Sequence, residues 1–297
     1  MKCDLCPRKC LVDRKKGEKG ICGQTENLKV ARAALHFWEE PCISGDAGSG
    51  AVFFSGCPLH CVFCQNENIA NGTVGKEISL ERLVDIFLEL QEKRANNINL
   101  VTPGHFVPQI VKALDQARKE GLTLPVVYNT SSYETVDTIK MLEGYVDIYL
   151  PDFKYMSPVL SKKYSHAPDY AEVAKAAIAE MVRQTGKAVF VNGDEDNLIL
   201  SGTIVRHLTL PGCMADSMQI LKYLHDTYGD MIYISIMNQF TPLSNLEKYL
   251  ELNRRITDEE YETLVDYAIE IGIENGFIQE GNTAEESFIP AFDCEGV

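Results

Sequence analysis

The chain from residue 51 onward alternates short apolar runs with longer segments whose apolar residues recur at helical spacing. This alternation is typical of parallel strands joined by crossover helices. Strands are expected at residues 51–54, 98–102, 125–129, 146–150, 204–210 and 231–237. Helices are expected to start after the N-cap residue Ser79 and to cover residues 105–119, 134–143, 169–185, 215–228 and 258–272. Because these units make up three quarters of an eight-unit barrel, the sequence predicts an α/β fold, a partial (β/α)6 TIM-like barrel with its site at the carboxyl ends of the strands.

The chain is expected to have one main domain and a small appendage. Its 297 residues suffice for one large core, and no long Pro-, Gly- or Ser-rich linker interrupts them. We place a cysteine-rich, metal-binding appendage at residues 1–45 and the barrel at residues 46–297. Residues 275–292 carry too many apolar side chains for a free tail, so we expect them to close over the open side of the barrel.

Composition and charge limit the cellular compartment and the classes of partner that we expect for the protein. No stretch approaches the roughly 18 apolar residues of a membrane span, so we expect a cytoplasmic protein with no membrane partner. The net charge of -15 disfavours nucleic acid as a partner, because proteins that bind it neutralise phosphates with Lys and Arg. Residues 1–37 are basic on balance, and no Lys or Arg follows Arg255. This asymmetry fits either a solvated acidic surface or a contact between opposite patches.

Seven of the ten cysteines fall into two tight clusters. In a reducing compartment such clusters favour metal ligation over disulfides. The first cluster, Cys57, Cys61 and Cys64, follows an apolar run and can hold three irons of a 4Fe-4S cluster while the fourth iron stays open. The alternatives are a zinc knuckle or three buried thiols, but structural zinc normally takes four protein ligands and no fourth Cys or His stands at matching spacing after Cys64.

The segment from Gly48 to Leu59, together with these cysteines, resembles the radical S-adenosylmethionine (SAM) superfamily, and in particular the pyruvate formate-lyase activating enzyme-like proteins that activate glycyl-radical enzymes. The resemblance implies the same open barrel as the radical SAM core, with SAM bound at the open iron. It implies an anaerobic oxidoreductase that cleaves SAM reductively to a 5'-deoxyadenosyl radical, which abstracts a hydrogen atom. The implied partners are a glycyl-radical enzyme, whose glycine would be the hydrogen donor, and an electron donor such as flavodoxin or ferredoxin.

The resemblance also assigns cofactor-binding roles to individual residues. They are Phe63, Thr102, Gly104, Asn129, Thr130, Asp152, Lys154 and His207. Phe63 matches the position that contacts adenine, and Lys154 would meet the SAM carboxylate while Asp152 meets the ribose or the substrate. Without the resemblance, Phe63 is equally a core residue, and Asp152 and Lys154 fit a mutual salt bridge on a loop. Strand alternation places Arg206 and His207 on opposite faces, and we expect His207 to face the centre.

Two of these positions depart from the family pattern. The turn at Thr102 and Gly104 lacks the acid of the usual Gly-Gly-Glu, and Asn129 stands where activating enzymes have an acid. These departures leave open which atoms meet the SAM amino group, and whether a monovalent cation site exists.

The second cluster consists of Cys3, Cys6, Cys10 and Cys22. Four close thiols in a segment too polar for its own core predict a metal that folds the segment. Both zinc and an iron-sulfur cluster fit four sulfur ligands. Related proteins carry a similar Cys-Leu-Cys-Pro-Arg start.

Two alternatives to glycyl-radical activation stay open. A radical SAM enzyme of this kind could instead modify a small molecule, a peptide or an RNA, which for a small molecule predicts an enclosed cavity with convergent polar groups. A non-enzymatic iron-sulfur redox carrier would use both clusters without binding SAM.

Overall fold

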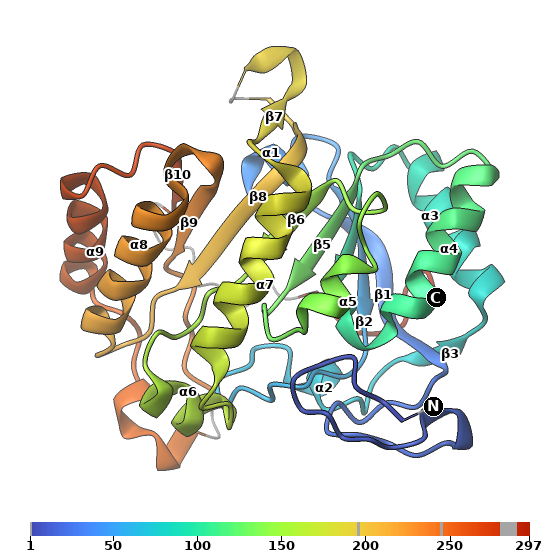
Figure 1. The fold of residues 1–297 in the computed structure, drawn as a ribbon, viewed down its shortest axis with the longest axis horizontal. Helices are drawn as coiled ribbons and strands as arrows, with labels where there is room; N and C mark the ends of the chain where they lie inside the picture. The colour runs from blue at the N-terminus through green and yellow to red at the C-terminus, as the bar shows by residue number, and fades with distance from the viewer. Residues whose placement is uncertain (1, 195–196, 244–245, 280–289) are drawn as a thin grey trace.

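The structure, a computed structural model, describes residues 2–194, 197–243, 246–279 and 290–297. Its centre is a twisted, mostly parallel sheet with the strand order β10-β9-β8-β6-β5-β4-β2-β1-β3, and β7 pairs with β8 beside this path (Figure 1). The strands have these bounds: β1 Leu28–His36, β2 Ser49–Phe54, β3 Lys76–Ile78, β4 Ile98–Val101, β5 Val126–Thr130, β6 Ile148–Pro151, β7 Val189–Phe190, β8 Ile199–Leu208, β9 Tyr233–Met237 and β10 Gly276–Ile278. Strands β2, β4, β5, β6, β8, β9 and β10 run parallel, whereas β1 is antiparallel to β2 and β3.

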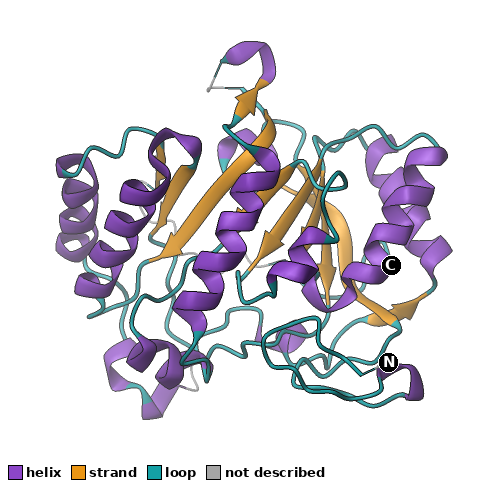
Figure 2. Ribbon diagram, viewed as in Figure 1, coloured by secondary structure: helices purple, strands orange, loops and turns teal. Residues whose placement is uncertain are grey.

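Helices connect the parallel strands and cover the outer face of the sheet (Figure 2). The longer ones are α3 Leu80–Glu92, α4 Val107–Lys119, α5 Val136–Lys140, α6 Pro158–Ser165, α7 Tyr170–Thr185, α8 Met214–Tyr228 and α9 Asp258–Glu270. Short helices are α1 Pro41–Ser44 and α2 Glu67–Ala70, and single 3-10 turns lie at Arg14–Lys16, Gly104–Phe106, Val191–Gly193, Gly229–Met231, Leu246–Lys248 and Leu250–Leu252. The predicted open α/β barrel is therefore confirmed.

Local sequence explains why these helices form and how they pack. Ser79 caps α3 by accepting a hydrogen bond from the Arg82 amide, as its position before the apolar pattern predicted. The apolar face of α3, with Phe87 and Leu90 fully buried, packs against the sheet. Helix α9 begins with a capping box in which Thr257 and Glu260 satisfy each other's backbone amides.

All six predicted strands are present, but the fifth is longer than expected. It begins at Ile199 rather than residue 204 and ends at Leu208. Strands β1, β3, β7 and β10 were not predicted. Strand β1, from within the range assigned to the appendage, pairs with β2 from Val30 to His36. The division between residues 45 and 46 stays a prediction.

The predicted closing segment falls partly on residues 280–289, which lie outside the described residues. The residues after it lie along β1, where the Ala33 amide donates to the Glu295 carbonyl and the Cys294 amide donates to the Ala31 carbonyl. Arg32 on β1 also forms ion pairs with Asp293 and Glu295. The described end of the chain is thus bound to the first strand of the sheet.

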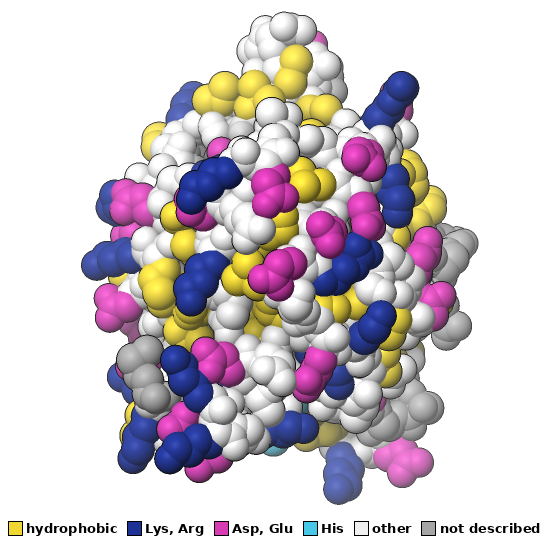
Figure 3. Space-filling model, turned by 90° about the vertical axis from the view of Figure 1, so that its right-hand side faces the viewer, with side chains coloured by type: hydrophobic (Ala, Val, Ile, Leu, Met, Phe, Trp, Pro, Cys, Tyr) yellow, Lys and Arg dark blue, Asp and Glu magenta, His cyan; other side chains and the backbone are white. Residues whose placement is uncertain are grey.

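On the face turned toward the viewer in Figure 3, Lys and Arg side chains are interspersed with Asp and Glu. Neither positive nor negative side chains form a large patch on this face, so the acidic side chains there lie in solvent among basic ones. Across the described residues, no helix is both long enough and apolar enough to pass through a membrane.

Candidate active site

A cavity of about 420 Å³ opens at the carboxyl ends of the parallel strands. Residues that follow β2, β4, β5 and β6 line it, together with residues of β8 and β9. Its volume lies within the roughly 300–1,000 Å³ typical of small-molecule sites. The parallel sheet thus gathers the ends of its strands around one space, as the barrel architecture requires.

The loop after β2 places Cys57, Cys61 and Cys64 on the lining of this cavity. Burial, together with the neighbouring Cys61, raises the pKa of the Cys57 thiol to about 11 and that of Cys64 to about 12. Backbone amides of the same loop hydrogen-bond to both sulfurs and oppose this rise. The Ser165 hydroxyl donates to Cys61 Sγ over 3.0 Å.

This donor set fits an iron-sulfur cluster. Three thiols share one cavity, and the amides and the hydroxyl directed at their sulfurs would stabilise thiolates. Within the described ranges, no three His, Cys, Asp or Glu side chains stand in a ready-made metal-ligand geometry, so the thiols must turn toward a common point to hold a metal. Because thiols with raised pKa are protonated at neutral pH, loading the site releases protons.

Phe63, between the second and third of these cysteines, is 5% exposed and lines the cavity with one part of its ring. The other contacts of the ring are edge-on packing against Tyr155, Tyr164 and Phe240, with centroids 6.0–6.4 Å away. Phe63 therefore belongs to the core and to the cavity wall at the same time.

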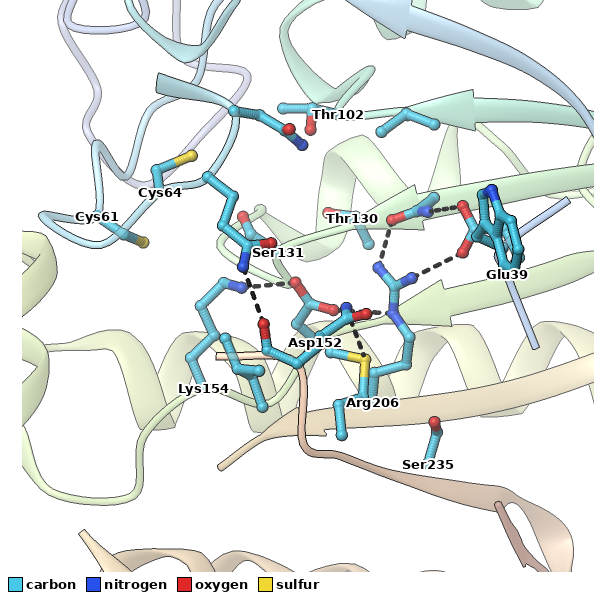
Figure 4. Close-up of a pocket in the computed structure, with 18 of the residues that line it drawn as sticks. Glu39, Cys61, Cys64, Thr102, Thr130, Ser131, Asp152, Lys154, Arg206 and Ser235 are labelled. Carbon is cyan, nitrogen blue, oxygen red and sulfur yellow. Dashed lines mark hydrogen bonds and ion pairs between the residues drawn. The ribbon is translucent and has the colours of Figure 1, made fainter. Parts of the chain in front are cut away.

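A chain of alternating charges crosses the cavity from β6 to the end of β1 (Figure 4). Lys154 Nζ donates to Asp152 Oδ2 over 2.6 Å, and Arg206 Nε donates to Asp152 Oδ1 over 3.0 Å. The guanidinium of Arg206 also donates to Glu39 Oε2 over 3.0 Å and to Asn129 Oδ1 over 2.6 Å. These four charged side chains are 9–16% exposed and therefore lie mostly out of water.

The charges in this chain stabilise one another. Burial by itself would raise the pKa of Asp152, but the Lys154 and Arg206 cations outweigh it and hold that pKa below its usual range. Burial would likewise lower the pKa of Lys154, and the Asp152 carboxylate reverses this. Both groups are thus ionised at neutral pH, and the lysine presents a fixed cation beside the cysteines.

Most predicted cofactor residues meet at this cavity. Phe63, Thr102, Asn129, Thr130, Asp152 and Lys154 all line it. Gly104 does not, because it faces Glu134 instead, and a Cβ added at Gly104 would lie 2.8 Å from that carboxylate. The role of the Gly104 position is therefore close packing over the buried Glu134, which also accepts a hydrogen bond from the Tyr128 hydroxyl over 2.7 Å.

The prediction that His207 faces the centre is wrong. Its ring points into the helical layer, where Nδ1 lies 2.7 Å from the Phe153 carbonyl oxygen and Nε2 lies 2.9 Å from Ser217 Oγ. Burial lowers the pKa of His207 to about 4, so it is neutral at physiological pH. Alternation along β8 does separate the two neighbours as expected, but Arg206 is the one that enters the cavity.

Sequence reasoning missed the acidic residues that follow β1. Glu39 accepts hydrogen bonds from Asn99 and Asn129, each over 3.1 Å, as well as from Arg206. Glu40, next in the chain, also lines the cavity and is 8% exposed. The available signal was the mainly apolar run of residues 28–35, interrupted by two basic residues and followed by an acidic pair, which fits a strand that delivers carboxylates to a site.

The amino-terminal cysteines lie close together and against the cysteine loop of the barrel. The charges of Cys3, Cys10 and Cys22 act on the Cys6 thiol, and burial raises its pKa to about 12. The Ile21 amide donates to Cys10 Sγ over 3.3 Å. Amide donors directed at sulfur are typical of thiolate metal sites, but the four thiols, like those of the barrel, do not stand in a ready-made metal-ligand geometry in the described chain.

Two arginines fasten this segment to the barrel. Arg8 donates to the carbonyl oxygens of Pro58 and Ser165, each over 2.9 Å, and so joins the cysteine loop to the end of α6. Arg14 is 7% exposed and donates to the His105 carbonyl over 2.5 Å. The amino-terminal cysteines are therefore held beside the cavity rather than on a free arm.

Comparisons with known proteins agree with this geometry. Residues 51–197 match the sequence model of the radical SAM superfamily. The uncharacterized protein MJ0674 of Methanocaldococcus jannaschii is 27% identical over 275 residues, which cover 90% of this chain and 74% of that protein.

Solved structures share the fold. SuiB of Streptococcus suis bound to S-adenosylmethionine has a TM-score of 0.52 at 12% identity, and HydG, a maturase of the FeFe hydrogenase, has a TM-score of 0.51 at 15% identity. The matches cover 76% and 78% of this chain but only 49% and 52% of those two chains, so this chain spans about half of their length.

Proposed function

We propose that this chain is a radical SAM enzyme that binds a 4Fe-4S cluster through Cys57, Cys61 and Cys64, because residues 51–197 match the sequence model of the radical SAM superfamily. The observation that carries the proposal is that these three thiols share one cavity with the fixed Lys154 cation and the Asp152 carboxylate. A cluster held by these three cysteines and given one electron would supply the reductive cleavage of SAM, with a hydrogen atom taken from the substrate.

The protein's own residues would position SAM. Lys154 is oriented by Asp152 at 2.6 Å and offers a cation for a carboxylate, while the wall at Phe63 offers an apolar surface for a base. The Tyr170 hydroxyl lies 2.9 Å from the carbonyl oxygens of both Ser131 and Asp152 and shares its one proton between them, which ties the loops after β5 and β6 together. This pre-organised wall would limit movement of the reacting groups.

The spectrum of the reduced cluster tests this proposal. Protein reconstituted anaerobically with iron and sulfide and then reduced should give a 4Fe-4S electron paramagnetic resonance signal that shifts when SAM is added, because SAM changes the ligation of the open iron. Cys64→Ala should lose the part of the signal that shifts with SAM, even if an iron-sulfur cluster at the amino-terminal cysteines keeps its own signal. Cys294→Ala, outside both clusters, should keep the whole signal and the shift. A wild-type signal that SAM leaves unchanged would refute the open-iron site.

A glycine of a partner enzyme is one proposed hydrogen donor. It is supported by the pattern from Asp147 through Asp152 to Lys154, which resembles activating enzymes. A flavodoxin or ferredoxin is the corresponding electron donor. A glycyl-radical spectrum that appears on a candidate partner only with SAM and reductant would support this role, and product formation without any protein radical would oppose it.

We also propose that Cys3, Cys6, Cys10 and Cys22 bind a second metal, either zinc or an iron-sulfur cluster. The mutual charge effects of the four thiols and the amide donated to Cys10 support the site. Elemental analysis should find that Cys6→Ser loses one metal centre while Cys294→Ser loses none. Equal metal content in the two variants would rule the second site out.

A further inference from the structure

One acidic side chain in the cavity is left out of the ion-pair chain. Glu40 lines the cavity and is 8% exposed, and its Oε2 has no hydrogen-bond partner. Arg206 lies close enough for its charge to act on Glu40, but its three hydrogen bonds go to Asp152, Glu39 and Asn129. A buried carboxyl oxygen without a donor is costly, so the structure leaves an acceptor here that a ligand can fill.

The other charged side chains that line the cavity are paired with one another, whereas Glu40 is not paired. Lys154 and Arg206 are matched by Asp152 and Glu39, which they contact directly. His36, also in the lining, has its pKa lowered by burial to about 4 and is neutral. Among the described lining residues, Glu40 therefore has no cation in direct contact. Burial raises the pKa of Glu40 in spite of the Arg206 charge, and a cation bound beside its free Oε2 would supply the missing counter-charge.

The surroundings of Glu40 suit a cation. The Ser235 hydroxyl lies beside its carboxyl group, and the aromatic side chains of Trp38, Phe53 and Phe277 line the same cavity. Aromatic faces attract ammonium groups, and a carboxylate adds a charged hydrogen-bond acceptor. In Figure 4, Glu39 and Ser235 lie on the side of Asp152 away from Cys61 and Cys64, which places this acidic end far from the cysteines.

We propose that the acidic end of the cavity binds the positively charged amino group of a small substrate, with Glu40 as its acceptor. This inference rests on the proposed function, in which the cysteine end of the cavity is occupied by the cluster and SAM. The remaining end is then the place from which a substrate presents its hydrogen atom.

The only tryptophan in the chain, Trp38, lines this end and serves as a reporter. The full chain is titrated with n-butylammonium, with n-butanol as the neutral analogue and with butyrate as the anion, while Trp38 fluorescence is followed. The amine should bind at least about 10-fold more tightly than the other two, because one charged hydrogen bond distinguishes them. Glu40→Gln should lose this preference, and Asp46→Asn, which removes an exposed acid outside the cavity lining, should keep it.

Glu40→Gln should fold, because it replaces a buried acid by a neutral amide of the same size, and an unchanged circular dichroism spectrum checks this. Equal affinity for amine and alcohol, no saturable response to any probe, or an unchanged amine affinity in a folded Glu40→Gln would each overturn the proposal. The titration needs neither cluster nor SAM. If the protein failed to cleave SAM, the titration result would still hold. If the titration failed, the proposed SAM cleavage would be unaffected.

Discussion

Arg206 is the residue on which the polar part of the cavity depends. Its guanidinium joins the end of β6, the segment after β1 and the end of β5 through Asp152, Glu39 and Asn129. Asp152 and Glu39 are mostly buried. Removing the Arg206 cation would therefore leave two buried carboxylates with too little positive charge beside them.

Arg206→Met should therefore lower the free energy of unfolding by about 3 kcal/mol, because an uncompensated buried charge is strongly destabilising. Urea unfolding of protein in one defined metal state measures it. Lys222→Met is the control, since Lys222 pairs with Asp226 at the surface, where both side chains are more than half exposed, and it should show a much smaller loss. Equal losses in the two variants would mean that the network at Arg206 contributes no special stability.

Lys154 supplies the cation expected to meet the SAM carboxylate. Lys154→Met should weaken SAM binding to the iron-loaded protein by about 10-fold or more, the value of a hydrogen bond to a charged group. Equilibrium dialysis with labelled SAM measures the affinity. Lys162→Met, at an exposed position of α6, should bind SAM like the wild type. A Lys154→Met affinity within error of the Lys162→Met value would remove this role.

Arg206 and His207 show what strand alternation can and cannot decide. The sequence places them on opposite faces of β8, and the structure agrees. Which one faces inward depends on the partners across the sheet, namely Asp152 on one side and Ser217 of α8 on the other. Those contacts join residues distant in the chain, so a periodic pattern along one strand does not contain them.

At the scale of elements, the amino-terminal segment and β1 carry more of the site than the sequence indicated. Strand β1 has the burial pattern of an inner strand, yet basic residues within it made it resemble the polar appendage. It was therefore missed, and Glu39 and Glu40, which follow it, were missed with it. The parallel strands were found because their residues are buried on both faces and form continuous apolar runs.

The buried Arg14 fastens the cysteine-rich segment to the barrel through the carbonyl oxygens of Thr25 and His105 and lies over the Phe106 ring at 5.4 Å. Arg14→Met should let this segment detach, and protease cleavage within residues 2–27 should become about 10-fold faster. Lys16→Met, exposed in the same turn, should be cleaved at the wild-type rate. Identical cleavage of the two variants would show that other contacts hold the segment.

At the scale of the whole molecule, the barrel brings two sets of thiols and one charged cavity to the same end. The repeating strand and helix pattern was enough to predict the open barrel and the position of its site, because the carboxyl ends of parallel strands meet at one edge. The acidic end of the cavity was not predictable, since it arises where the segment after β1 reaches Arg206 of β8 and Ser235 of β9, which are distant in the chain.

The central claim is that one iron, left open by three cysteines, cleaves SAM. The most direct test is to quantify 5'-deoxyadenosine after anaerobic reconstitution, reduction and addition of SAM. The wild type should form it, Cys61→Ala should form none while keeping the metal at the amino-terminal cysteines, and Cys294→Ala should match the wild type. Absence of 5'-deoxyadenosine from fully loaded, reduced wild-type protein, or its formation by Cys61→Ala, would contradict the account.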